Sequence, residues 1–287
     1  MRRWKRAGAF AAGGLILGTA AAAAGGTLLW KRATARAVRR LRARVNHGES
    51  ADAKFSREQL AGLPDPVARY FDFVLLPGQR MIRHARVRWA GEFRLRKGTW
   101  SPFTADQYFT TNPPGFVWDA RIRMGPLVPV RVRDAYLAGE GVMLGAVGAV
   151  LPVANQRGTP ELAAGALSRY LGEAVWLPTA LLPNEHLTWE AMDDTTARAT
   201  LTDGAVSVSA EFHFGRGGPI VGVSMTRERD VKGRAVPTPF EATLGRDYRR
   251  AGSVMIPTSG EAAWILPEGR FAYWRGRPLG VVYEPAS

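Results

Sequence analysis

The stretch ARVRWAGEFRLR, residues 85–96, alternates apolar side chains at its odd positions with charged ones at most of its even positions. In a β-strand successive side chains point to opposite faces, so this alternation predicts a strand with one dry face and one polar face. Such strands suit an antiparallel sheet, because one face of the sheet packs on a core while the other faces water.

The same strand period recurs in three groups of segments. The first group continues through residues 103–110, 116–124 and 128–133. The second covers residues 187–229 and contains Asp203-Gly204, a turn of the kind that joins the two strands of a hairpin. The third, interrupted by Pro and Gly, covers residues 240–283. Together they predict many antiparallel strands joined by short turns.

One long helix is predicted between the first two groups of strands. Thr159 takes its cap position and Pro160 its first turn, and apolar residues then recur at helical spacing until Pro178. Two shorter helices are predicted nearer the N-terminus, one opened by a capping box at Ser56 and one beginning at Asp65.

The net charge of +14 comes almost wholly from the N-terminus. The first 44 residues hold 11 Lys and Arg and no acidic residue, so the rest of the chain carries +3 (28 basic against 25 acidic). Residues 7–30 are 24 uncharged positions, enough to cross a hydrocarbon core of about 30 Å. They predict a transmembrane helix, with a cleaved signal peptide ending in the small residues 20–24 as the alternative.

The predicted domains are a basic N-terminus (1–6), the transmembrane helix (7–30), a basic juxtamembrane linker or helix (31–54) and a single β-rich domain (55–287). The fold class is therefore α+β: a curved antiparallel β-sheet or half-barrel packed around a central helix, preceded by an N-terminal transmembrane helix. The expected location is the cell membrane, with a single pass. Four basic residues precede the span and seven follow it within fifteen residues, which favours a cytoplasmic body.

Several classes of chemistry have no motif in this sequence. The absence of Cys excludes disulfides and thiol catalysis, and the four His are too scattered to indicate a metal site or a catalytic triad. There is no HExxH, GxSxG or P-loop motif. No metal or cofactor is therefore expected, and no motif identifies a reaction. The body's balance of +3 gives no reason to expect nucleic acid as a partner.

The leading functional hypothesis is a non-enzymatic, membrane-anchored binder of a lipid or other hydrophobic ligand. Large aromatic side chains on the dry face of the strands must face something apolar, and they are the candidate ligand-binding residues. These are Trp89, Phe93, Phe109, Phe116 and Trp118, with Trp176 at the end of the long helix. The alternative is that the long helix itself fills the hollow of the sheet.

A second hypothesis is an enzyme of unknown class. Arg169 and Glu173 are four residues apart on the predicted helix, so they share one face and can pair. Glu173 is the candidate acid or base, and Arg169 or Arg121 would bind an anion. The alternative is an ion pair that fastens the helix to the sheet.

A third hypothesis is a scaffold on the membrane surface. Its Arg-rich sheet face would bind anionic lipid headgroups through Arg86, Arg88, Arg94 and Arg96. The alternative is a solvated outer face with ion pairs to Glu92, Asp106 and Asp119 on neighbouring strands.

Four segments resemble an uncharacterised bacterial family, a domain of unknown function with an N-terminal hydrophobic segment. They are PDPVARYFDFVL, PPGFVWDARI, RYLGEAVWLPTALLP and the tripeptide Asp247-Tyr248-Arg249. The resemblance spans about residues 60–274, and it implies no established activity. The order of strands, helix and strands is also similar to the half-barrels of lipoprotein-localisation carriers, which implies an acyl-chain ligand and an extracytoplasmic body. The ligand, the orientation, cleavage of the N-terminus and the oligomeric state stay open.

Overall fold

The computed structural model describes residues 23–45, 53–96, 98–124 and 129–285. Within them, 13 antiparallel strands form one sheet in the order β6-β5-β4-β3-β2-β1-β15-β14-β11-β10-β9-β8-β7, and β12 and β13 form a separate hairpin. The strands are β1 (Ile82–Arg96), β2 (Thr99–Thr110), β3 (Gly115–Arg123), β4 (Pro129–Leu137), β5 (Glu140–Val147), β6 (Leu151–Arg157), β7 (Leu187–Asp193), β8 (Thr196–Asp203), β9 (Val206–Phe214), β10 (Ile220–Val231), β11 (Arg234–Leu244), β12 (Tyr248–Ala251), β13 (Val254–Pro257), β14 (Gly260–Leu266) and β15 (Gly269–Pro285).

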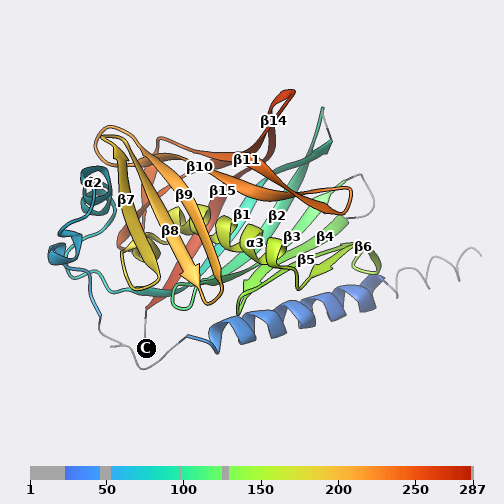
Figure 1. Cartoon of the computed structure of the whole chain (residues 1–287). Helices are drawn as coiled ribbons and strands as arrows, with labels where there is room; N and C mark the ends of the chain where they lie inside the picture. The colour runs from blue at the N-terminus through green and yellow to red at the C-terminus, as the bar shows by residue number, and fades with distance from the viewer. Residues whose placement is uncertain (1–22, 46–52, 97, 125–128, 286–287) are drawn as a thin grey trace, which may run out of the picture.

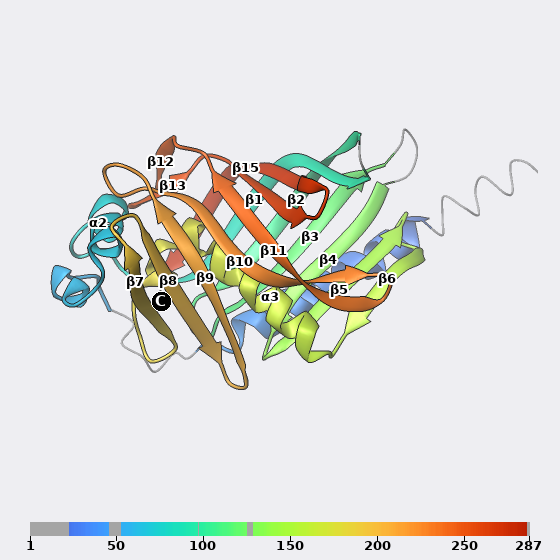
Figure 2. The same cartoon turned by 45° about the horizontal axis from the view of Figure 1, so that its top comes forward.

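The large sheet has two wings that meet at its last strand. The first wing is β1–β6 and the second is β7–β11 with β14, and β15 pairs with β1 on one side and with β14 on the other. The sheet curves around helix α3 (Pro160–Glu173), which lies in its hollow (Figures 1 and 2). The prediction of a curved antiparallel sheet around a central helix is confirmed.

The strand that the alternation predicted is β1. Val87 and Trp89 are 0% and 2% exposed, whereas Arg86 and Arg88 on the other face are exposed to solvent. The predicted hairpin turn is also confirmed, because Gly204 joins β8 to β9 with a φ of 59°.

Helix α3 begins and packs as its sequence predicted. The Thr159 hydroxyl accepts a hydrogen bond from the backbone N–H of Leu162 (3.2 Å) and so caps the helix. Leu167 and Leu171 are fully buried against the sheet. Strand β5 comes unusually close to α3 at Gly141, where an added Cβ would lie 2.3 Å from the carbonyl oxygen of Leu162.

Short helical segments close one end of the sheet. Helix α2 (Asp65–Val74) was predicted, but the capping box at Ser56 opens only a single 3-10 turn, η1 (Arg57–Leu60), because Leu63-Pro64 follows too soon for a second turn. Two more 3-10 turns, η2 (Ala174–Trp176) and η3 (Pro178–Leu181), continue from α3.

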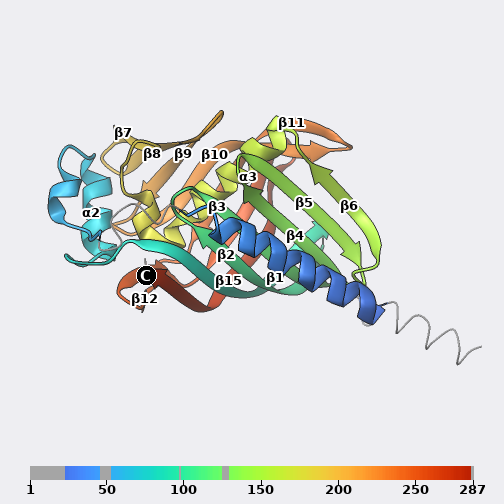
Figure 3. The same cartoon turned by 90° about the horizontal axis from the view of Figure 1, so that it is seen from below.

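A helix over residues 23–42 lies along the outer face of the first wing (Figure 3). Trp30 Nε1 and the Thr34 hydroxyl both donate to the carboxylate of Asp119 on β3 (2.8 and 2.9 Å). Arg133 on β4 donates to the Thr34 hydroxyl and to the carbonyl oxygen of Trp30, and its guanidinium lies 4.5 Å from the Trp30 ring centroid. Leu41 packs on the same face of the sheet. The basic segment after residue 30 is thus bound to the domain along much of its length.

The predicted transmembrane helix (7–30) stays a prediction. Residues 7–22 lie outside the described residues, and residues 23–30 form the first turns of the docked helix. Among the helices that the structure describes, none combines the length and the apolar character needed to cross a bilayer.

Candidate ligand-binding cavity

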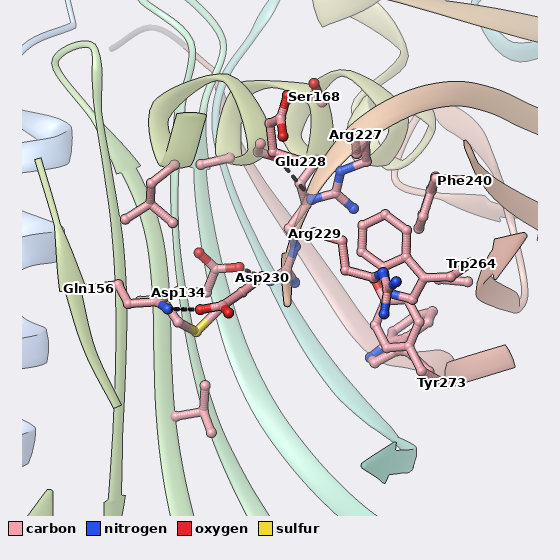
Figure 4. Close-up of a pocket in the computed structure, with 18 of the residues that line it drawn as sticks. Asp134, Gln156, Ser168, Arg227, Glu228, Arg229, Asp230, Phe240, Trp264 and Tyr273 are labelled. Carbon is pink, nitrogen blue, oxygen red and sulfur yellow. Dashed lines mark hydrogen bonds and ion pairs between the residues drawn. The ribbon is translucent and has the colours of Figure 1, made fainter. Parts of the chain in front are cut away.

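A cavity of about 1170 Å³ lies between α3 and the concave face of the sheet. Its walls come from β1 and β3–β6 of the first wing and from β10, β11, β14 and β15 on the opposite side, and α3 lies along it (Figure 4). Helix α3 therefore does not fill the hollow. Space for a ligand remains beside the helix.

Aromatic side chains form the wall on the side of β11, β14 and β15. The Trp264 ring stacks on that of Tyr273 with 5.9 Å between centroids, and Phe240 meets Trp264 edge-on at 5.5 Å. Met225 and Phe271 extend this apolar surface. A wall built in this way suits an apolar ligand with few polar groups.

The two wings also touch across the mouth of the hollow. The side-chain amide of Gln156 on β6 donates to the carboxylate of Asp230, near the end of β10 (Figure 4). This contact joins one edge of the sheet to the β10–β11 hairpin and so borders the opening of the cavity.

A polar network crosses the inner face of the first wing beside α3. Arg169 Nε donates to Glu173 (2.8 Å), and Arg169 Nη1 donates to Asp134 on β4 (2.6 Å). The second oxygen of Glu173 accepts from the Gln107 amide (2.6 Å), whose own oxygen accepts from Trp89 Nε1 (2.8 Å). The network ties α3 to three strands of the sheet.

The charges of this network stabilise one another. The side chains of Arg169, Asp134 and Glu173 are only 15%, 10% and 20% exposed. Burial alone would lower the pKa of Arg169, but Glu173 and Asp134 outweigh burial, so the pKa of Arg169 is raised. Because both oxygens of Glu173 accept hydrogen bonds from residues of the network, the geometry favours the ion pair that fastens helix to sheet over an acid or base.

The predicted ligand-binding residues divide into two groups. Phe93, Trp118 and Trp176 line the cavity. Trp89, Phe109 and Phe116 face the interior as predicted but do not line it, because other side chains cover them. The ring of Trp176 lies against Trp89, that of Tyr170 against Phe109, and the guanidinium of Arg169 over Phe116. The alternation indicates which face a residue takes, but not how much packs over it.

Several site residues were missed by the sequence analysis. Asp134 and Gln107 occupy inward positions on strand faces that are otherwise apolar, and a polar residue on the dry face is the signal that would have identified them. Phe240, Trp264 and Tyr273 lie in the group of strands interrupted by Pro and Gly, where no clear alternation marked a face.

Two arginines of the predicted Arg-rich face, Arg86 and Arg94, are engaged within the protein. Arg86 donates twice to Asp106 on β2, as the alternative predicted, and Arg88 is exposed. The guanidinium of Arg94 instead lies over the Trp100 and Phe271 rings, at 4.8 and 4.7 Å from their centroids. The structure does not describe the side chain of Arg96.

The neighbouring acidic residues are also engaged. Glu92 pairs with Arg275 rather than with an Arg of its own strand, and Asp119 binds the N-terminal helix. Arg121, the other proposed anion binder, is exposed on the outer face, away from Glu173. Among the side chains that the structure describes, no cluster of three or more His, Asp or Glu is arranged to hold a metal ion.

Comparison with known proteins confirms the predicted resemblance. No curated protein matches the chain. Among solved structures, a LolA superfamily protein from Nitrosomonas europaea is similar at 12% identity, with 78% of this chain and 94% of that chain covered and a TM-score of 0.35. A β-barrel-like protein of the DUF1849 family from Brucella abortus is similar at 7% identity, with 71% and 99% covered and a TM-score of 0.27. Both structural likenesses are weak. The model of a family of unknown function, DUF6544, matches residues 53–276, and the chain therefore belongs to that family.

Proposed function

We propose that the β-rich domain binds a hydrophobic ligand in the cavity beside α3, without catalysing a reaction. The observation that carries this proposal is the cavity of about 1170 Å³ left open between α3 and an aromatic wall. An open cavity of this size leaves apolar side chains in contact with water, so an apolar occupant that covers them would stabilise the domain.

The cavity is large enough for an acyl chain. At ~30 Å³ for a water-sized group, about the size of a methylene, it holds roughly forty such groups. A chain of about sixteen carbons would use less than half of that volume, and each methylene buried would contribute about 0.8 kcal/mol. Long-chain lipids are therefore the class of ligand that suits the site.

We further propose that the chain is anchored to the membrane by residues 7–30. Support comes from the described end of that segment and from the residues beside it. Leu28 and Leu29 are 50% and 64% exposed, and Val150, just before β6, and Leu151, at its start, are 53% and 63% exposed. The two groups adjoin, since an added Cβ at Gly26 would lie 2.7 Å from Val150. An exposed apolar patch beside an uncharged segment suits a bilayer surface.

Ligand binding is tested by photo-crosslinking of the full chain in its membrane. A photoactivatable hexadecanol analogue is the probe, and mass spectrometry maps the labelled peptides. We expect labelling within β5, β6, β10 and β14 that Ala154→Trp, which places a large ring in the cavity, strongly reduces. The control is Thr188→Trp on the exposed face of β7. Equal labelling of these peptides in both variants, or none in the wild type, would refute the proposal.

Anchoring is tested separately with a reporter fused to the C-terminus. We expect the full chain to resist extraction from membranes by alkaline carbonate, and the reporter to indicate the cytoplasmic side. An extractable chain contradicts the anchor, and a reporter on the opposite side contradicts the orientation.

A further inference from the structure

The wall of the cavity carries hydrogen-bond donors that lack acceptors. Arg94 Nε, Trp118 Nε1, Arg227 Nε and Trp274 Nε1 are buried on cavity-lining residues and have no hydrogen-bond partner within the described part of the chain. Indole and guanidinium N–H groups can only donate. Since an unpaired buried polar group destabilises a protein, a surplus of donors indicates a ligand that supplies acceptor oxygens.

Arg227 is the charged group best placed to bind such a ligand. It projects from β10, where its Nη2 donates to the carbonyl oxygen of Gly165 on α3 (2.8 Å). Its guanidinium lies 4.8 Å from the Phe240 ring centroid and 5.8 Å from that of Trp264, on the aromatic wall. No carboxylate of the described residues forms an ion pair with it, whereas Arg169 has two. A half-buried guanidinium without a counter-ion is a site for an anion.

Arg94 supplies a second positive charge at the same wall. Its guanidinium stacks on Phe271, and Phe271 is directly opposite Trp264 in the pairing of β14 with β15. The rings between Arg94 and Arg227 thus form one apolar surface with a guanidinium at each end. Arg94 also lacks a carboxylate partner among the described residues.

The acidic groups of the cavity fix where an anion would bind. Asp134 and Glu173 share Arg169, so that trio carries one net negative charge beside α3 and the first wing. Glu161, Asp230 and Glu268 also border the cavity, but they are exposed and screened by solvent. Glu228 and Glu261 line it as well and are half-buried, and Glu261 is paired with Arg270. Figure 4 shows Arg227 beside Phe240 and Trp264, with Asp134 on the other side of the cavity. An anion would be repelled by the Asp134–Arg169–Glu173 trio and attracted to Arg227, and both effects favour a position beside Arg227 on the aromatic wall.

We propose that the ligand is an anionic amphiphile whose carboxylate or phosphate binds Arg227, with Arg94 as a second guanidinium, and whose chain lies along the aromatic wall. This inference rests on the proposed function, since it names the head group of the same ligand. A charge-assisted hydrogen bond to Arg227 would make an anionic ligand bind about ten- to a hundredfold more tightly than a neutral one of equal chain length.

The experiment measures competition against the same hexadecanol probe on the full chain in neutral lipid nanodiscs. The competitors are hexadecanoic acid, hexadecyl phosphate, hexadecanol and hexadecyltrimethylammonium, at matched mole fractions. We expect at least one of the two anions to compete at a tenfold or lower mole fraction than the alcohol. Which anion does so distinguishes a fatty acid from a lipid phosphate.

Variants assign the preference to Arg227. Arg227→Gln should abolish this preference, so that acid, phosphate and alcohol compete at similar mole fractions, and Arg227→Lys should retain part of it. The control is Arg216→Gln, an exposed residue in the turn after β9. A wild-type protein that binds acid, phosphate and alcohol alike, or that prefers the cation, overturns the inference and leaves the proposed function standing. A wild-type protein whose cavity peptides the probe never labels overturns the proposed function itself. If Arg227→Gln does not fold, the wild-type series still decides.

Discussion

Replacing Arg169 tests whether its network is structural. Arg169→Met keeps the length of the side chain but leaves Asp134 and Glu173, 10% and 20% exposed, without a counter-charge. Removing one partner of a buried ion pair costs about 3–5 kcal/mol, and the contact with the Phe116 and Trp118 rings is weakened as well. At about 2–4 °C per kcal/mol for a domain of this size, the midpoint of thermal unfolding should fall by roughly 6–20 °C.

Glu173→Gln provides the contrast. Asp134 remains to pair with Arg169, so the free energy of unfolding should fall by only about 1 kcal/mol, because one hydrogen bond, that from Gln107 to residue 173, is weakened. The triple variant Asp134→Asn, Arg169→Met, Glu173→Gln removes all three charges and should be more stable than Arg169→Met alone. The assay is equilibrium unfolding of the full chain in urea, followed by tryptophan fluorescence, with exposed Arg88→Met as the control. An Arg169→Met variant that unfolds like the wild type, or a triple variant less stable than the single one, would refute this reasoning.

Three further predictions concern packing, docking and capping. Gly141→Ala should lower the free energy of unfolding in urea by about 1–3 kcal/mol, because its Cβ would meet the Leu162 carbonyl. In Gly165→Ala the added Cβ would make only an ordinary contact, 3.8 Å from the carbonyl oxygen of Glu228, so this helix variant should be neutral or stabilising. Equal effects of the two variants would contradict the close approach at Gly141. Thr34→Val removes a hydroxyl that bonds two side chains of the sheet, so amide exchange over residues 23–42 should accelerate while that of α3 does not change. Thr159→Ala should lower the free energy of unfolding by about 0.5–2 kcal/mol in the same assay, and Thr159→Ser, which keeps the capping hydroxyl, should lower it much less. A Ser variant as unstable as the Ala variant would argue against capping.

The predictable part of the fold is the part in which one face meets the core and the other meets water. Strand β1 and the β8–β9 hairpin show a period of two for this reason, and α3 shows its cap and its apolar face. Strands β5 and β6 gave no signal because neither of them combines one buried face with one exposed face. Strand β5 is rich in small residues that approach α3, and β6 at the sheet edge is exposed on both faces.

Long-range pairing could not be predicted from the local period. Strand β15, the last in the chain, lies at the centre of the sheet between β1 and β14. Nothing in its own residues identifies β1, the first strand, as its partner. The sequence likewise indicated that Arg169 and Glu173 pair, because i and i+4 meet on any helix, but Asp134 joins them only through the curvature of the sheet.

Arg169 and Arg227 explain why the cavity stays open. Closing an apolar void of this size would gain roughly 25 cal/mol for each Å² removed from water, so something must hold α3 away from the walls. Arg169 reaches from α3 to Asp134 on the first wing, and Arg227 reaches from the second wing to the backbone of Gly165 on α3. Each is a long side chain whose charge is fixed at its far end, and a collapse of either wall onto α3 would have to break these bonds inside a low-dielectric core. The two arginines therefore act as spacers on opposite sides of the helix. In the proposed complex, an anion bound to Arg227 would satisfy the charge that this side chain brings into the core, so the residue that keeps the cavity open would also select what enters it.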